Sequence, residues 1–170
     1  IRNMFNGTIT NKGIEFRVET VGLTARYFMC DELRLMQVVT NLVSNASKFT
    51  PAGGKIEVTF KQLDNIGGKV QLLVRVRDTG KGIAPENIRK IFHPFEQEEA
   101  STAHNYGGTG LGLAICDNIV RMMGGNIVID STLGKGTDFS VFLSLAVADV
   151  EQDFTKPVGE DQPTVEADFE

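Results

Sequence analysis

A glycine-rich stretch, Gly107-Gly108-Thr109-Gly110-Leu111-Gly112-Leu113, stands directly before an apolar run with helical spacing. Glycines let the backbone come close to a ligand, and the free N–H groups of a helix's first turn attract an anion. The stretch is therefore a candidate phosphate cradle. A turn that only joins a strand to a helix would also explain these residues, so the stretch alone leaves both interpretations open.

Asn41, Asn45 and Lys48 are spaced four and three residues apart, within a run whose apolar residues fit one helical face. Asparagine is an indifferent helix former, so two of them in a helix interior need a reason. Either one of them hydrogen-bonds a neighbouring loop, or the three side chains together face a ligand.

Asp78 follows a strand-like run and precedes Gly80 and Gly82. An acid at this point either accepts hydrogen bonds from the N–H groups of its own turn or presents a carboxylate to a ligand at the rim of a sheet. Taken by itself, the segment does not decide between these two roles.

The elements that must position these residues follow from the hydrophobic pattern. Alternating residues predict strands at 14–19, 55–63, 70–77, 126–130 and 138–145, with a short strand at 25–29 pairing with the first. Helical spacing predicts a helix that follows Asp31 as its N-cap and ends at Thr50-Pro51, and further helices at 85–91 and 109–123. The residues 64–68 are predicted to connect a hairpin. This order predicts a two-layer α/β sandwich, with a mixed sheet and its helices on one face.

Charge divides the chain of 170 residues into a body, 1–146, and an acidic tail, 147–170. The tail holds eight acidic residues and one lysine, which give it a net charge of −7. Because the whole chain has a net charge of −5, the body has a net charge of +2. The tail contains two prolines and no apolar periodicity, and reads as a solvated linker. The nearly neutral body gives no case for nucleic acid, and no apolar run approaches the roughly 18 residues of a membrane span.

Five motifs in a fixed order resemble the catalytic and ATP-binding domain of the sensor histidine kinases of bacterial two-component systems. They are the N box (41–50), the G1 box (78–82), the F box Phe92-His93-Pro94-Phe95, the G2 box (107–113) and a G3-like turn (134–137). The resemblance covers roughly residues 14–146. It implies the histidine-kinase-like ATPase fold.

The resemblance also implies bound ATP with Mg²⁺. By it, Asn45 would coordinate Mg²⁺, Lys48 would lie near the phosphates, and Asp78 would accept from the adenine amino group with support from Thr137. The other positions that it places around the nucleotide are Phe49, Gly80, Gly82, Ile83, Gly107, Gly108, Thr109, Gly110, Leu111, Gly112 and Leu113.

Asn41 helps to choose among the relatives that share this fold. In ATP-hydrolysing members such as DNA gyrase, the residue four before the magnesium-binding asparagine is a glutamate that activates water. An amide cannot act as a general base, so Asn41 favours phosphoryl transfer to an acceptor that is already nucleophilic. ATP hydrolysis is the less favoured alternative.

Two departures from the family pattern suggest partners and a further alternative. The only histidines, His93 and His104, lie in the F box and in the predicted lid (96–106), so the phosphoacceptor is expected on an upstream dimerisation domain. The acidic tail suggests a receiver domain after it, as in a hybrid kinase. His104 stands where many relatives have an arginine, which leaves open a nucleotide-sensing module with weak or no phosphotransfer. The resemblance implies a cytoplasmic domain without direct membrane contact.

Overall fold

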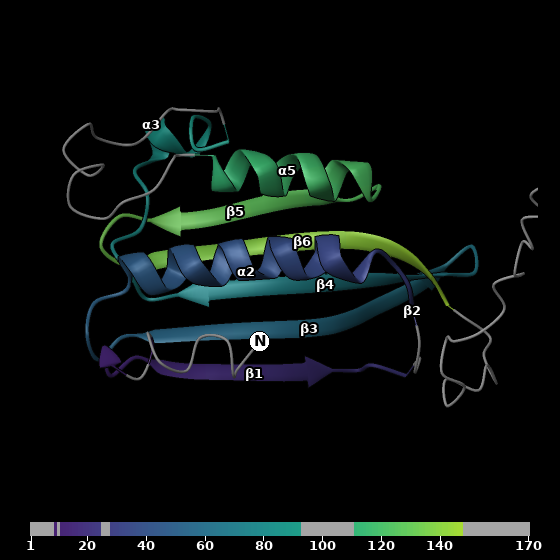
Figure 1. Ribbon diagram of the computed structural model, residues 1–170, viewed down its shortest axis with the longest axis horizontal. Helices are drawn as coiled ribbons and strands as arrows, with labels where there is room; N and C mark the ends of the chain where they lie inside the picture. The colour runs from purple at the N-terminus through teal and green to yellow at the C-terminus, as the bar shows by residue number, and fades with distance from the viewer. Residues whose placement is uncertain (1–8, 10, 25–27, 93–110, 148–170) are drawn as a thin grey trace, which may run out of the picture.

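The computed structural model describes residue 9 and residues 11–24, 28–92 and 111–147, and the structural statements below concern these residues. The elements follow one another from a strand at the N-terminal side to a long strand at the end of the body (Figure 1). They are β1 (Glu15–Val21), β2 (Phe28–Met29), α2 (Glu32–Phe49), β3 (Lys55–Ile66), β4 (Lys69–Asp78), α3 (Pro85–Ile88), α5 (Gly112–Met122), β5 (Asn126–Thr132) and β6 (Gly136–Val147).

The strands form one mixed sheet in the order β1-β3-β4-β6-β2, and β5 also pairs with β6. Strands β1 and β3 are parallel, whereas the other pairs are antiparallel. Helices α2 and α5 lie on the same side of this sheet, α2 over β4 and α5 over β5 (Figure 1). The predicted two-layer sandwich with helices on one face is therefore confirmed.

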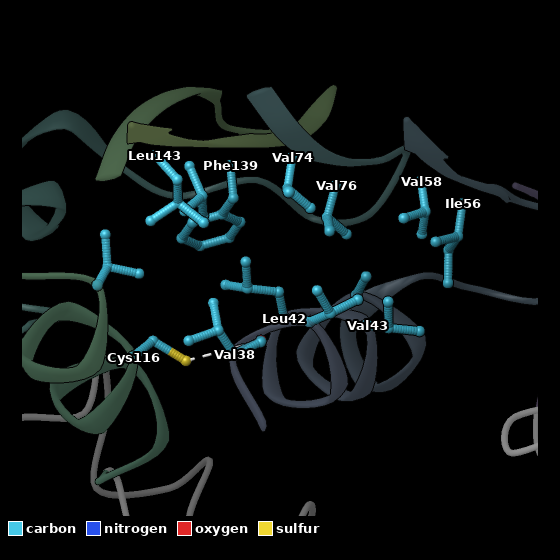
Figure 2. Close-up of a cluster of buried hydrophobic side chains, with 14 of the residues drawn as sticks. Val38, Leu42, Val43, Ile56, Val58, Val74, Val76, Cys116, Phe139 and Leu143 are labelled. Carbon is cyan, nitrogen blue, oxygen red and sulfur yellow. Dashed lines mark hydrogen bonds between the residues drawn. The ribbon is translucent and has the colours of Figure 1, made fainter. Parts of the chain in front are cut away.

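The core lies between the two layers because each layer is apolar on one face only. Along β4 every second residue from Val70 to Val76 is buried, the period expected of a strand with one covered face. Figure 2 shows side chains of the sheet, such as Val74 and Phe139, facing Val38 and Leu42 of α2 and Cys116 of α5. This packing holds the ends of α2 and β4 at a fixed separation.

Helix α2 begins and ends where the sequence predicts. Asp31 is its N-cap, and the Asp31 carboxylate accepts from the backbone N–H of Arg34 at 3.0 Å. At the other end, the Lys12 ammonium donates to the carbonyls of Ser47 and Lys48, at 2.8 and 3.4 Å. Lys12 thus satisfies carbonyls that the end of a helix leaves without partners, and its charge complements the negative end of the helix dipole.

The prediction for the short second strand was wrong in its partner. Phe28 and Met29 pair with Val147 and Ala146 of β6, not with β1. Residues 25–27 of the predicted strand lie outside the described residues. A two-residue strand carries too little pattern to specify a partner. The pairing is decided by β5, which pairs with β6 only as far as Phe142 and so leaves the same edge of β6 open at Ala146 and Val147.

Other boundaries differ by a few residues. The hairpin of β3 and β4 turns within two residues, Gly67 and Gly68, rather than over 64–68. Both glycines have positive φ, 59° and 75°, as a two-residue turn of the primed type requires. Helix α3 ends at Ile88 rather than at residue 91, and α5 begins at Gly112, with Leu111 as its N-cap. Within the described part of the chain, no helix is both long and apolar enough to cross a membrane.

Candidate functional site

Three segments meet at the C-terminal end of α2: the last turn of α2 with Thr50, the segment 78–83 after β4, and the turn 131–137 between β5 and β6. The Lys81 N–H donates to the Phe49 carbonyl at 3.3 Å, which ties the segment after β4 to α2. The Gly134 N–H donates to the Lys81 carbonyl at 2.6 Å, which ties the same segment to the β5–β6 turn. Residues from the N, G1 and G3-like motifs thus form one connected site.

Asp78 is the buried charge of this site. Its carboxylate accepts from the Gly80 N–H at 2.7 Å and from the backbone N–H of Thr137 on β6. Burial raises the pKa of Asp78 above its ordinary value, and the two N–H groups oppose this rise by stabilising the anion. The turn hydrogen bond, one of the two roles open at the sequence level, is therefore present.

The Asp78 carboxylate can accept further hydrogen bonds besides the one in its own turn. Two carboxylate oxygens offer about four acceptor positions, so two N–H donors leave capacity for a further donor. The role of Asp78 in its own turn and a role toward a ligand are therefore compatible, and the ligand role remains a prediction.

The glycines of the G1 motif are needed for close backbone packing inside the protein. A Cβ on Gly82, whose φ is +68°, would lie 2.0 Å from the Thr132 carbonyl oxygen. A Cβ on Gly80 would lie 2.7 Å from both the Asp78 carboxylate and the Phe49 carbonyl oxygen. The expected approach of these glycines to a ligand is untested, but the structure gives both an independent reason to lack a side chain.

Ser131 is a residue of this site that the sequence analysis did not identify. Its hydroxyl accepts from the Ile83 N–H at 2.9 Å, donates to the Gly136 carbonyl at 3.0 Å, and lies 2.9 Å from the Thr137 hydroxyl. Ser131 therefore joins the segment after Asp78 to the turn that carries Thr137. Serine is common near glycine turns, so the sequence around Ser131 offered no signal for this role.

On α2, Asn41 and Asn45 are half-buried and one helical turn apart, and Lys48 follows in the last turn. The Asn41 side chain hydrogen-bonds the thiol of Cys116, a buried residue of α5. Burial raises the pKa of Cys116 to about 11, so the thiol is neutral, and it donates to the Val38 carbonyl at 3.8 Å. Asn41 thus contacts the helix that begins at the end of the glycine-rich stretch.

Phe49 makes two cation–π contacts. The ammonium groups of Lys48 and Lys81 each stand over its ring, 5.0 Å from the ring centroid. Burial, and then the charge of Lys81, lower the pKa of Lys48. Ile83 is half-buried and packs against the core, so it can form an apolar wall beside this cluster.

Part of the predicted site falls outside the described residues. Leu111, Gly112 and Leu113 are described at the start of α5, and Leu113 packs against the core. The predicted residues outside the description are Gly107, Gly108, Thr109, Gly110, the F-box residues after Phe92, the lid (96–106) with His104, and the tail from 148 on.

The sequence of this chain matches a known family over most of its length. Residues 30–147 match the family described as histidine kinase-, DNA gyrase B-, and HSP90-like ATPase. The chain is 40% identical over 144 residues to the autoinducer 2 sensor kinase/phosphatase LuxQ of Vibrio parahaemolyticus, covering 84% of this chain and 17% of that protein. It is 41% identical over 131 residues to the sensor protein GacS of Pseudomonas syringae, covering 76% of this chain and 14% of that protein. The chain thus spans less than a fifth of the length of these relatives.

Solved structures agree with these sequence matches. Full-length ShkA in complex with AMPPNP superposes with a TM-score of 0.71 at 34% identity, covering 86% of this chain and 28% of that one. The catalytic domain of the histidine kinase ThkA superposes with a TM-score of 0.68 at 29% identity, covering 85% of this chain and 88% of that one. The chain therefore belongs to the histidine kinase-, DNA gyrase B- and HSP90-like ATPases, as a catalytic domain of the sensor histidine kinase type.

Proposed function

We propose that this chain binds ATP with Mg²⁺ and transfers the γ-phosphoryl group to a histidine on a separate dimerisation domain. The observation that carries the proposal is the buried Asp78 carboxylate, held by two backbone N–H groups next to the cationic end of α2. One end of such a site suits an amino group and the other suits phosphates, which are the two ends of ATP.

The side chains at the end of α2 suit both Mg²⁺ and the phosphates of ATP. Mg²⁺ takes oxygen ligands and is commonly completed by phosphates and water, so the amide oxygen of Asn45 is a suitable protein ligand. The Lys48 ammonium group can bind phosphate as a point charge. The N-terminal end of α5 can bind phosphate through the free N–H groups of its first turn. When bound, Mg²⁺ would neutralise charge on the phosphates and help to align them.

The residues of the chain would act mainly by positioning. Asp78 would orient the base by accepting from its amino group, with Thr137 held beside it by Ser131. Phe49 and Ile83 would exclude water from the base. Phosphoryl transfer depends largely on alignment and charge neutralisation, so a site without a general base can support it. Gly107, Gly108, Thr109, Gly110, Leu111, Gly112 and Leu113 would cradle the phosphates.

Asn41 bears on the kind of reaction. Its side chain is an amide, which cannot take a proton from water, and it is engaged with the Cys116 thiol. This supports transfer to an imidazole, which needs no activation by a base, over hydrolysis of ATP.

The similarity to ShkA, whose structure contains AMPPNP, and to the sensor kinases supports the proposal. By the same reasoning we propose that the acceptor histidine lies on a dimerisation domain outside this chain, that a receiver domain follows the acidic tail, and that the domain works in the cytoplasm.

The test combines this chain with the dimerisation domain of a similar sensor kinase and radiolabelled ATP. We expect acid-labile, base-stable label on the dimerisation domain, and loss of that label in Asn45→Ala but not in Asn65→Ala, a control in the distant β3–β4 hairpin. ATP binding without label in any pairing would instead support a nucleotide-sensing module. Steady ATP hydrolysis by the chain alone would contradict the role given to Asn41.

A further inference from the structure

The cluster of Lys48, Phe49 and Lys81 carries an inference that rests on the proposed function and deepens it. The two ammonium groups are each 5.0 Å from one ring centroid, so they are at most twice that distance apart. The screening length is about 8 Å at physiological salt and about 30 Å at 0.01 M salt, so any repulsion between the two charges is strongest at low salt. The lowered pKa of Lys48, to which Lys81 contributes, is the expected consequence.

The backbone holds this arrangement in place. The Lys81 N–H is bonded to the Phe49 carbonyl, and the Lys81 carbonyl is bonded to the Gly134 N–H. Lys81 also lies between Gly80 and Gly82. The backbone at both glycines packs so closely against its neighbours that a Cβ would not fit at either position. The exposed Lys81 side chain therefore projects from a fixed point toward the ring of Phe49.

The aromatic ring attracts each ammonium group, whereas the two ammonium groups repel each other. A ligand with several negative charges attracts both ammonium groups at once. A base or a neutral ligand does not. The cluster thus has the chemistry of a polyphosphate site, rather than that of a base-stacking site alone.

We propose that Lys81 is a second phosphate-binding residue, which together with Lys48 contacts the phosphate chain of the nucleotide and sets the preference for nucleoside triphosphate over nucleoside. The Phe49 ring keeps both ammonium groups near that chain. Lys81 acts on affinity through charge, so its effect is sensitive to salt.

The test measures the affinity of the 170-residue chain for Mg·ATP and for adenosine by calorimetry, at low and at physiological salt. Lys81→Met keeps most of the aliphatic stem and removes the charge. Because a contact between a charged group and phosphate is lost, ATP affinity is expected to fall about tenfold or more, with adenosine affinity within about twofold of wild type. Lys81→Arg should restore most of the ATP affinity, and Lys69→Met, at the far end of the sheet, should leave it unchanged.

Equal loss of ATP and adenosine affinity in Lys81→Met would overturn the proposal and assign Lys81 to support of the Phe49 ring. Unchanged ATP affinity would overturn it as well. If the wild-type chain bound neither ligand, the proposed function itself would fail. If the wild-type chain bound ATP and Lys81→Met bound it equally well, only the proposal for Lys81 would fail.

Discussion

Gly82→Ala should separate the cost of a left-handed backbone from the cost of a steric contact. Gly82 and Gly67 have similar positive φ values, +68° and +59°. A Cβ at Gly67 meets nothing within 4 Å, whereas one at Gly82 would lie 2.0 Å from the backbone oxygen of Thr132. Gly67→Ala is therefore a matched control, because it carries the same backbone penalty without the contact.

The expected magnitudes follow from this difference. An alanine in the left-handed region costs roughly 1–2 kcal/mol of unfolding free energy in either variant. Overpacking adds about 1–3 kcal/mol, and in Gly82→Ala the displaced atom belongs to the backbone and cannot simply rotate away. Gly82→Ala should thus lose roughly 2–5 kcal/mol and Gly67→Ala about 1–2 kcal/mol, which a domain of ordinary stability survives.

Urea unfolding followed by far-ultraviolet circular dichroism measures both, since the chain has no tryptophan. Gly82 lies between Lys81 and Ile83, so its displacement from the β5–β6 turn should also weaken ATP binding, whereas Gly67→Ala should leave binding intact. Equal destabilisation by the two substitutions would refute the reasoning, since it would mean that the contact with Thr132 costs nothing.

Three further predictions concern hydrogen bonding, pH and packing. Ser131→Ala removes the acceptor of the Ile83 N–H and should cost about 1–3 kcal/mol of unfolding free energy and weaken ATP binding. Ser140→Ala, which removes only a long hydrogen bond of 3.4 Å to the Asp138 carboxylate, should cost less and leave ATP binding unchanged in the same two assays. Because burial raises the pKa of Asp78, protonation of its carboxylate removes an acceptor, so affinity for ATP relative to inosine triphosphate should fall as pH decreases toward that pKa. The sign for stability is opposite: the folded protein binds this proton more readily than the unfolded chain, so ionised Asp78 reduces stability in full above its folded pKa. This cost declines as pH falls from the folded pKa to the lower, ordinary pKa of the unfolded chain, and is absent below it. A ratio independent of pH would argue against an ionised Asp78 at the amino group. Leu42→Ala, at a fully buried position, should cost about 3–5 kcal/mol in urea unfolding, and a loss under about 1 kcal/mol would contradict the packing of the two layers.

Local pattern was sufficient to predict most elements of this protein. Asp31 marks the start of α2 because its side chain can bond only to N–H groups a few residues away, and Thr50-Pro51 marks its end. Alternation along β4 predicts which side chains face the helices, because the period of a strand is a property of its backbone. The motifs around Asn45, Asp78 and Thr137 likewise stand in the sequence, so their residues could be named before their positions were known.

Only the tertiary structure decided what these elements contact. Strand β2 pairs with β6 because β5 leaves that edge of β6 open after Phe142, a fact about the whole sheet that two residues cannot encode. Ser131 becomes part of the site because the β5–β6 turn lies against Ile83, and Lys12 meets the end of α2 from more than thirty residues away. Gly82 is required by Thr132, fifty positions later in the chain. Such contacts join residues distant in sequence, and they exist only once the apolar faces of sheet and helices have packed together.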